Sequence, residues 1–302
     1  MALEDGKTTR TLDVKELQKF LVEKGVVPES VLAEKDTFPL SDEALALAVA
    51  SLPEEFSGLE GVYTKATAEA YRGLASVFAE PRRAIPLLRE AYGKADSDGT
   101  KLVYAHVLAF LGDATGAGDL AAKVRGSAWD KGWNYRGMGQ FGRSVSWLDS
   151  FIIALGRTKA PAAFEAVAAR AKELGPDCEY SHFRAVALAF ESLGDRRAAP
   201  VLKELLSKPG VGGHSFLFER DGAPAIKDYD KYNFSGKDGK ATGGNAVPDR
   251  ERSYCLRELC LARALYRLGD AEGLGEKTLR AYASDPRRAY ANHARQVLAP
   301  AR

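Results

Sequence analysis

The chain has few cysteines, no excess of one charge and no long apolar run. Its 302 residues include three cysteines without a Cys-x-x-Cys spacing, which argues against a disulfide framework and a cysteine-based zinc site. Forty-three basic residues stand against 41 acidic ones, so the basic excess typical of nucleic-acid-binding proteins is missing. No apolar stretch approaches the roughly 18 residues of a membrane span, and Met1–Arg10 does not resemble a signal peptide. We therefore expect a soluble protein whose partners include neither nucleic acid nor membrane.

Four segments share one pattern, in which an apolar helix ends in Leu-Gly, a short polar corner follows and a second apolar helix begins. These segments are Leu102–Arg125, Ser146–Leu174, Ser181–Lys208 and Ser253–Tyr282. The Leu-Gly pairs recur at a spacing close to the roughly 40–47 residues of a HEAT unit, except where an insert lengthens the last interval. Since one helix pair cannot bury both of its faces, neighbouring pairs are expected to stack into an α-solenoid.

The corner of each unit has a simple physical interpretation. Glycine adopts the left-handed conformation that ends many helices. We expect this role for the glycine of each Leu-Gly pair, namely Gly112, Gly156, Gly194 and Gly269. The aspartate that follows the glycine in three of the four units is expected to cap the start of the next helix. Between the corners, Ala, Leu and Val spaced by three or four residues predict the buried face of each helix.

The N-terminal segments also show helical patterns. Asp13–Gly25 is predicted to form an amphipathic helix, and Asp42–Leu52 a further helix. Thr67–Ala95 indicates a weaker unit, in which Glu80-Pro81 replaces the Gly-Asp corner. Proline is well tolerated in the first turn of a helix, so this substitution is compatible with the repeat.

The sequence thus predicts an all-α fold, with a linker and an amphipathic helix at 1–35 and an irregular HEAT-like α-solenoid at 36–302. Two long inserts interrupt the solenoid, a glycine- and aromatic-rich one at 127–145 and a polar one at 209–252. Each insert joins the second helix of one unit to the first helix of the next. Inserts in repeat proteins gather on one face, which is often a binding face, so we expect both loops to pack together on one edge.

The inserts supply the candidate binding residues. In the first insert, aromatic side chains alternate with charged ones, a composition that suits a partner protein, the edge of a flavin or a sugar ring. The alternative is that these rings seal the solenoid core beneath the insert. The candidates from both inserts are Trp129, Asp130, Trp133, Asn134, Tyr135, Arg136, Gln140, Arg143, His214 and Arg252.

Other motifs have plainer interpretations. Gly137–Gly142 matches Gly-x-Gly-x-x-Gly, but no β-strand pattern precedes it, so we interpret it as a glycine-rich loop and not as a dinucleotide site. The four histidines show no metal-ligand spacing. His106 and His182 fit satisfied packing positions, and His214 is the candidate acid or base. The dense charges of Asp249–Glu258 predict a solvated helix entry.

Three stretches resemble the C-terminal region of large bacterial FAD-dependent oxidoreductases with HEAT-like repeats. They are WDKGWNYRGMGQFGRSVSWLDSFIIALGRT at Trp129–Thr158, RELCLARALYRLGD at Arg257–Asp270, and the opening at Met1–Val26. The opening is similar to the end of the flavin domain of that family and the linker after it. The resemblance implies that Met1 lies inside a larger ancestral protein whose flavin fingerprint is upstream, and it is compatible with a periplasmic location.

The function expected from the repeat and the resemblance is that of a non-catalytic accessory domain. Its insert edge would dock a flavin domain, in cis or in trans, or another protein. No cofactor is expected in this chain, and FAD enters only through an upstream or partner domain. Two alternatives stay open, a binding or catalytic surface for carbohydrate-like substrates on the first insert and a true flavoprotein.

Overall fold

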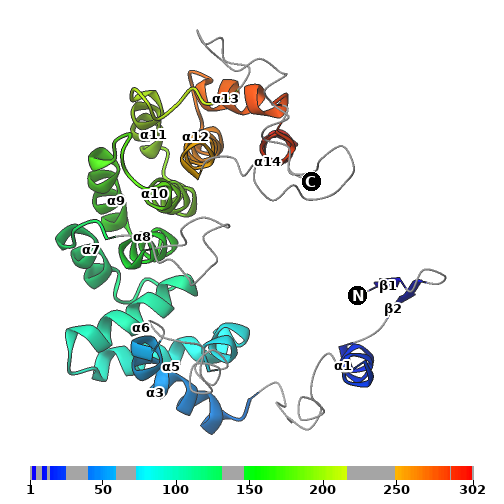
Figure 1. Cartoon of the computed structure of the whole chain (residues 1–302). Coiled ribbons are helices and arrows are strands. Elements are labelled where there is room, and N and C mark those ends of the chain that lie inside the picture. Colours follow the sequence, from blue (N-terminus) through cyan, green and yellow to red (C-terminus); the bar gives the residue numbers. More distant parts are fainter. Residues whose placement is uncertain are drawn as a thin grey trace.

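The structure is a computed structural model that describes most of the chain. The described residues are 2–4, 9–11, 14–24, 40–58, 73–130, 146–215, 249–285 and 287–300. Within them the regular structure is helical, apart from a small ribbon in which β1 (Ala2–Glu4) pairs antiparallel with β2 (Thr9–Thr11). The predicted all-α solenoid is confirmed, and the ribbon lies outside it (Figure 1).

Four helix pairs form the body of the solenoid. In chain order they are α6 (Asp98–Phe110) with α7 (Ala117–Gly126), α8 (Trp147–Arg157) with α9 (Pro161–Glu173), α10 (Tyr180–Leu193) with α11 (Ala198–Ser207), and α12 (Asp249–Leu268) with α13 (Leu274–Ala283). The first helices stack in the order α6, α8, α10 and α12, and α7, α9 and α11 form a second row. Figure 1 shows an arc with α8, α10 and α12 on its inner side and α7, α9 and α11 on its outer side.

Further helices close the two ends of the array. Before α6 lie α3 (Asp42–Gly58), a helical stretch at 73–79 and α5 (Pro81–Lys94), which share a smaller core with α6. After α13, α14 (Arg288–Leu298) packs against α12 and α13. In Figure 1, α1 (Val14–Glu23) lies apart from the array. The helices expected near the N-terminus are therefore present, and α3 extends beyond its predicted end through Pro53.

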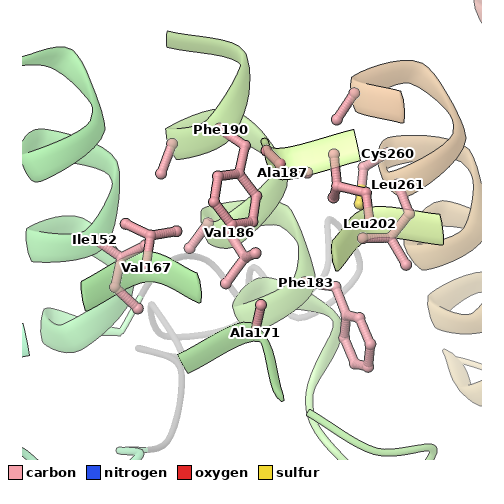
Figure 2. Close-up of a cluster of buried hydrophobic side chains, with 14 of the residues drawn as sticks. Ile152, Val167, Ala171, Phe183, Val186, Ala187, Phe190, Leu202, Cys260 and Leu261 are labelled. Carbon is pink, nitrogen blue, oxygen red and sulfur yellow. The ribbon is translucent and has the colours of Figure 1, made fainter. Parts of the chain in front are cut away.

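An apolar core rich in alanine and leucine runs through the stacked helices. In Figure 2, Ile152 and Val167 lie on one side of α10, and Leu202 and Leu261 lie on the other. Small residues set the closest approach between helices, because a Cβ on Gly156 would lie 2.4 Å from the Cα of Ala189. The backbones of α8 and α10 therefore come into direct contact, which makes this part of the core sensitive to a single added methyl group.

Three of the four predicted glycine corners are confirmed, and one is wrong. Gly112, Gly194 and Gly269 have φ angles of 83°, 67° and 93°, in the left-handed region that glycine reaches without strain. Gly156 instead lies inside α8, where its missing side chain serves the contact with α10. Lys159 adopts the left-handed conformation in that corner, with a φ of 53°.

The aspartates that follow the glycines hold the corners together. Asp113 and Asp195 each accept the backbone N–H of the residue two positions ahead, both at 2.9 Å. Such local turns are typical of aspartate side chains. Asp270 reaches into the next helix, where it accepts the N–H of Gly275. The predicted capping of the second helix is therefore confirmed at one corner, and the other two corners use a local turn.

Candidate functional site

We use the name loop edge for the side of the solenoid where each second helix leads into the first helix of the next unit. Its described residues are 127–130, 146, 174–180 and 208–215, with the first turns of α8, α10 and α12. Lys208 donates from Nζ to the carbonyl oxygens of Lys172 and Leu174, at 3.0 and 2.8 Å. A Cβ on Gly210 would lie 3.1 Å from Pro176. Trp129, in the first insert, donates to Glu173 just before the join at 174–180, so the described starts of both inserts lie along one edge.

Asp130 caps the N-terminus of α8 across the first insert. Its Oδ2 accepts the N–H of Trp147 at 2.9 Å, and its Oδ1 accepts the N–H of Leu148 at 3.2 Å. Ser146 and Asp149 form a capping box on the same turn. A carboxylate here satisfies N–H groups that have no partner within the helix, and the helix dipole favours its charge. Asp130, a predicted binding residue, thus ties together the two ends of the insert.

Trp129 is packed among charged and aromatic neighbours. Its indole N–H donates to Glu173 Oε2 at 2.8 Å, and its ring centroid lies 4.5 Å from that of His182. The guanidinium carbon of Arg170 lies 5.5 Å from the centroid of the same indole ring. Trp129 is half-buried and contacts the main core. For this one aromatic, the contacts match the alternative in which the rings seal the core beneath the insert.

Arg170, on α9, fixes the C-terminal end of α7. Its side chain is buried and donates hydrogen bonds to the carbonyl oxygens of Val124, Arg125 and Ser127. The Nε of Arg170 lies 2.7 Å from the first of these oxygens. Carbonyl groups in the last turn of a helix have no intrahelical partner, and a cation there also meets the negative end of the helix dipole. Arg170 therefore fixes the point at which the first insert leaves the array.

A buried pair of carboxylate and imidazole lies beside Trp129. Asp149 Oδ1 lies 2.7 Å from His182 Nδ1, and both residues are buried. The other oxygen of Asp149 accepts the N–H of Ser146 at 3.0 Å, so the carboxylate links the cap of α8 to α10. The short contact between Asp149 Oδ1 and His182 Nδ1 is a hydrogen bond that joins the two buried side chains. His182 is a satisfied packing residue, as the sequence predicts.

Glu258, on α12, anchors the start of the second insert. The carboxylate accepts the backbone N–H of Gly213 at 2.6 Å and that of His214 at 2.8 Å. It also accepts the hydroxyl of Tyr282 at 2.7 Å. Burial and the charge of Glu258 raise the pKa of Tyr282 well above its ordinary value, so the phenol keeps the proton that it donates. These donors replace water around a residue that is only 1% exposed.

Arg287, the N-cap residue of α14, holds the same segment. It is buried and pairs with the buried carboxylate of Asp285. It also donates to the carbonyl oxygen of His214 at 2.9 Å and to Cys255 Sγ at 3.1 Å. Burial alone lowers the pKa of Arg287, but the hydrogen bonds to Asp285 raise it above the ordinary value. The guanidinium therefore stays charged, and the His214 backbone is held at both its N–H and its carbonyl group.

Arg257 joins the second and third connections of the loop edge. It is 1% exposed and donates to the carbonyl oxygens of Pro176, at 2.8 Å, and Gly210. Its guanidinium carbon lies 4.9 Å from the ring centroid of Phe183 and 4.6 Å from that of Tyr254. Burial lowers the pKa of Arg257 below its ordinary value, which is the cost of removing this charge from water.

The predicted solvated helix entry at Asp249–Glu258 is wrong for its last two charges. Both residues are buried because their hydrogen-bond partners lie in the connections between units. Arg257 donates to Pro176, 81 residues away, and Glu258 accepts from Gly213, 45 residues away. Arg252 lies within α12, and its side chain is outside the described residues.

His214, the candidate acid or base, stacks on a tyrosine at the start of α12. Its ring centroid lies 5.0 Å from that of Tyr254, with the two rings 28° from parallel. Its Nε2 lies 3.3 Å from the carbonyl oxygen of Gly210. The structure places His214 on the loop edge with a half-buried side chain. Its role in acid–base chemistry stays a prediction.

The other candidates of the first insert lie outside the described residues. They are Trp133, Asn134, Tyr135, Arg136, Gln140 and Arg143, and the Gly137–Gly142 motif lies there too. In the part of the chain that the structure describes, no group of three or more His, Cys, Asp or Glu residues is placed to hold a metal ion. Among the same residues, no helix has the length and apolar character needed to cross a membrane.

The sequence analysis did not identify Arg170, Glu258 and Arg287 as functional residues. Their hydrogen bonds to the backbone hold the loop edge in place. A signal for the first two was present. Arg170 follows Ala163 and Val167 at helical spacing, so it falls on the buried stripe of α9. Glu258 falls on the buried stripe of α12 in the same way, three residues after Cys255. A charged residue at an apolar position of a helix indicates a buried polar contact.

The stacked helix pairs and their loop edge define a helical-repeat protein of the α-solenoid class. Residues 184–208, which cover most of α10 and all of α11, match the family model of the PBS lyase HEAT-like repeat. The match includes the Gly194 corner. No curated protein and no solved structure matches the chain. The chain therefore contains a HEAT-like region, as the repeat pattern predicts.

Proposed function

We propose that this protein is a non-catalytic HEAT-like interaction module that docks a partner protein through its loop edge. The sequence resemblance suggests the flavin domain of an FAD-dependent oxidoreductase as that partner, in cis or in trans. In this proposal FAD enters the assembly with the partner domain, and the solenoid supplies a binding surface.

The observation that supports the proposal is the way in which both inserts are anchored. Arg170 and Asp130 fix the two ends of the first insert, and Glu258, Arg287 and Arg257 fix the start of the second. Burying charged groups is costly unless every one of them is hydrogen-bonded. A loop that presents side chains to a partner gains from a fixed starting point.

The anchoring charges act on the backbone and on one another. Arg170 and Arg257 donate to main-chain carbonyl groups, and Glu258 accepts main-chain N–H groups. Groups that are committed in this way position the loops and are not exposed to substrate. This arrangement favours a scaffold for binding over a catalytic centre in the described part of the edge.

The test is binding of the purified full chain to a flavin domain from the resembled oxidoreductase family, measured by biolayer interferometry. We expect saturable binding that Trp133→Ala and Arg143→Ala each weaken about 10-fold or more, as central aromatic and arginine contacts do. Lys123→Ala, an exposed residue of α7, serves as the control and should leave the affinity unchanged. No binding by the wild-type chain, or equal binding by all four proteins, would refute the proposal.

The same experiment addresses the alternatives. Trp129 is engaged with Glu173 and His182, so a carbohydrate-like ligand would depend on the aromatics of the first insert outside the described residues. A panel of oligosaccharides binding the wild-type chain but not Trp133→Ala would replace the partner protein with a sugar. Uptake of added FAD by the chain alone would contradict the assignment of the cofactor to the partner.

A further inference from the structure

A groove lies on the outer side of the solenoid, between α11 and the corner that joins α12 to α13. Its volume is about 510 Å³. The residues that line it are Ala199, Pro200, Lys203, Glu204, Ser207, Leu265, Gly269, Asp270, Ala271 and Glu272. None of them belongs to the described part of the loop edge, so the groove is a separate surface.

The groove exists because the outer row of helices stops at α11. α7 packs on α9, and α9 packs on α11, but in the described contacts α13 packs on α12 and α14. Glycine permits that close packing, since a Cβ on Gly275 would lie 2.8 Å from the carbonyl oxygen of Ala262. With α13 drawn onto α12, the flank of α11 that would face the next outer helix remains open.

The open flank has the dimensions of a helix-binding site. Ala199, Lys203 and Ser207 line it at intervals of four residues, so they form one face along α11. Eight residues of rise correspond to about 12 Å, or about two turns of a helix lying alongside. On the corresponding flank, α7 is covered by α9, and α9 is covered by α11. Continuation of the row would therefore place a further helix in the groove.

The chemistry of the groove selects the side chains of that helix. The exposed surface of its walls is mostly apolar, and Leu265 forms part of the floor. Glu204, Asp270 and Glu272 give three acidic groups against the single cation of Lys203. The Lys203–Glu272 ion pair spans the two walls with both side chains more than one third exposed, so it contributes little stability. A second cation, Arg196, lies near Gly269, where a Cβ would be 3.9 Å from its Nε.

We propose that this groove binds an amphipathic helix of a partner protein, with a narrow stripe of small apolar residues flanked by lysine or arginine. The apolar stripe packs between α11 and the corner, as helices pack into grooves elsewhere. The flanking cations pair with Glu204 and Glu272 on the rim. The bound helix extends the outer row by one member.

The probe is a displayed library of alanine-based helices, randomised among Leu, Ala, Lys and Glu on one face, selected on the immobilised full chain. We expect the selected peptides to carry a Leu/Ala stripe with lysines beside it. A synthetic copy of one selected peptide, labelled for fluorescence anisotropy, is then titrated with wild-type protein and with the double variant Glu204→Lys/Glu272→Lys. We expect the double variant to weaken binding about 10-fold or more, because two attractive contacts become repulsive.

Two further proteins make the result specific to the groove. Ser207→Trp places a large side chain into the groove without changing charge, and it should abolish binding. A double variant at exposed glutamates outside the groove, Glu90→Lys/Glu165→Lys, should bind as the wild type does. Selected peptides with acidic flanks, or selected peptides that the groove variants bind as well as the wild type does, would overturn the proposal. Binding of the flavin domain should be unaffected by Glu204→Lys/Glu272→Lys, so failure here is distinct from failure at the loop edge.

Discussion

The two edges of the solenoid are held together in different ways. On the edge where a first helix turns into its second helix, Asp113 and Asp195 each accept an N–H two residues ahead, and Asp113 also pairs with Arg89 of α5. On the loop edge, Arg170 reaches carbonyl groups 43 to 46 residues back. Glu258 reaches N–H groups 44 and 45 residues back. The corner edge thus combines local turns with ion pairs whose arginines are partly exposed, and the loop edge depends on bonds between units that buried charges make.

The difference shows which edge determines how the units fit together. A local turn forms within one helix pair, so its loss changes little else. A bond between units requires the whole array to be in place, and it takes a charge out of water. The buried charge is tolerated only while its hydrogen bonds remain intact. Substitutions on the loop edge are therefore expected to cost more than substitutions at the corners.

Removal of the Glu258 carboxylate is expected to have the largest effect. Glu258→Ala leaves two partly buried N–H groups and the buried hydroxyl of Tyr282 without their acceptor, and we expect a loss of about 3–4 kcal/mol in the free energy of unfolding. Urea denaturation followed by circular dichroism measures it. Glu204→Ala, at an exposed position of α11, is the control and should change stability by less than about 0.5 kcal/mol. Equal losses in the two variants would contradict the contrast between the edges.

Arg170→Met tests the first insert in the same way. The apolar replacement keeps most of the side-chain volume but leaves the carbonyl groups at the end of α7 without their donor. We expect a loss of about 2–3 kcal/mol, again from urea denaturation. Arg125→Met, at an exposed position of α7, provides the control and should be nearly neutral. A loss larger than that of Glu258→Ala would mean that the first insert, not the second, is the more strongly anchored.

The repeat could be predicted from the sequence because its signals are local. Leu-Gly pairs and apolar residues at helical spacing lie within one helix hairpin, and three of the four expected glycine corners are present. The prediction for Gly156 was wrong because a glycine is required there by another unit. The backbone of α10 packs directly against Gly156 and leaves no room for a side chain. A glycine at the end of a helix and a glycine at a helix crossing look the same in the sequence.

The partners of the loop-edge anchors could not be predicted for a related reason. Arg257 and Glu258 lie in a charged stretch, and charge by itself predicts exposure. Their burial depends on Pro176, Gly210 and Gly213, which approach only once the units have stacked. The candidates Trp129 and Asp130 were correctly placed at the edge, but their described contacts are structural.

The interior between the two edges supplies a pH-dependent contribution. His106 is buried, with Nε2 2.9 Å from Ser150 Oγ, and burial lowers its pKa to about 4. The unfolded chain binds this proton near pH 6.5, so the folded state loses stability as the pH falls from there towards 4. Between about pH 7.5 and pH 5 we expect His106 to account for a loss of about 2 kcal/mol.

The measurement compares urea denaturation of the wild type and His106→Phe at the two pH values. The variant keeps an aromatic ring beside Phe110 and Phe151 but carries no titrating group. Its stability should fall less than that of the wild type on acidification. An identical fall in both proteins would show that other groups govern the pH dependence.

Gly156→Ala tests the contact between α8 and α10. The added Cβ would lie 2.4 Å from the Cα of Ala189, and backbone cannot move aside as a side-chain tip can. We expect a net loss of about 1–2 kcal/mol despite the higher helix propensity of alanine. Gly93→Ala in α5, where nothing lies within 4 Å of the new Cβ, should instead gain about 0.5–1 kcal/mol. Stabilisation by both substitutions would show that α8 and α10 are farther apart than described.

The smallest effect is expected at a corner, and its sign is opposite. Lys159 adopts a φ of 53°, which is strained for a residue with a Cβ. Lys159→Gly should therefore stabilise the protein by about 0.5–1 kcal/mol. Lys123→Gly inside α7 should destabilise it by about 1 kcal/mol, because no strain is relieved there.

If the corners are independent of the loop edge, the gain from Lys159→Gly should add to the loss from Arg170→Met within about 0.5 kcal/mol. A larger deviation in the double variant would mean that the turn at Lys159 depends on the stacking of the units, so that the two edges form one cooperative system.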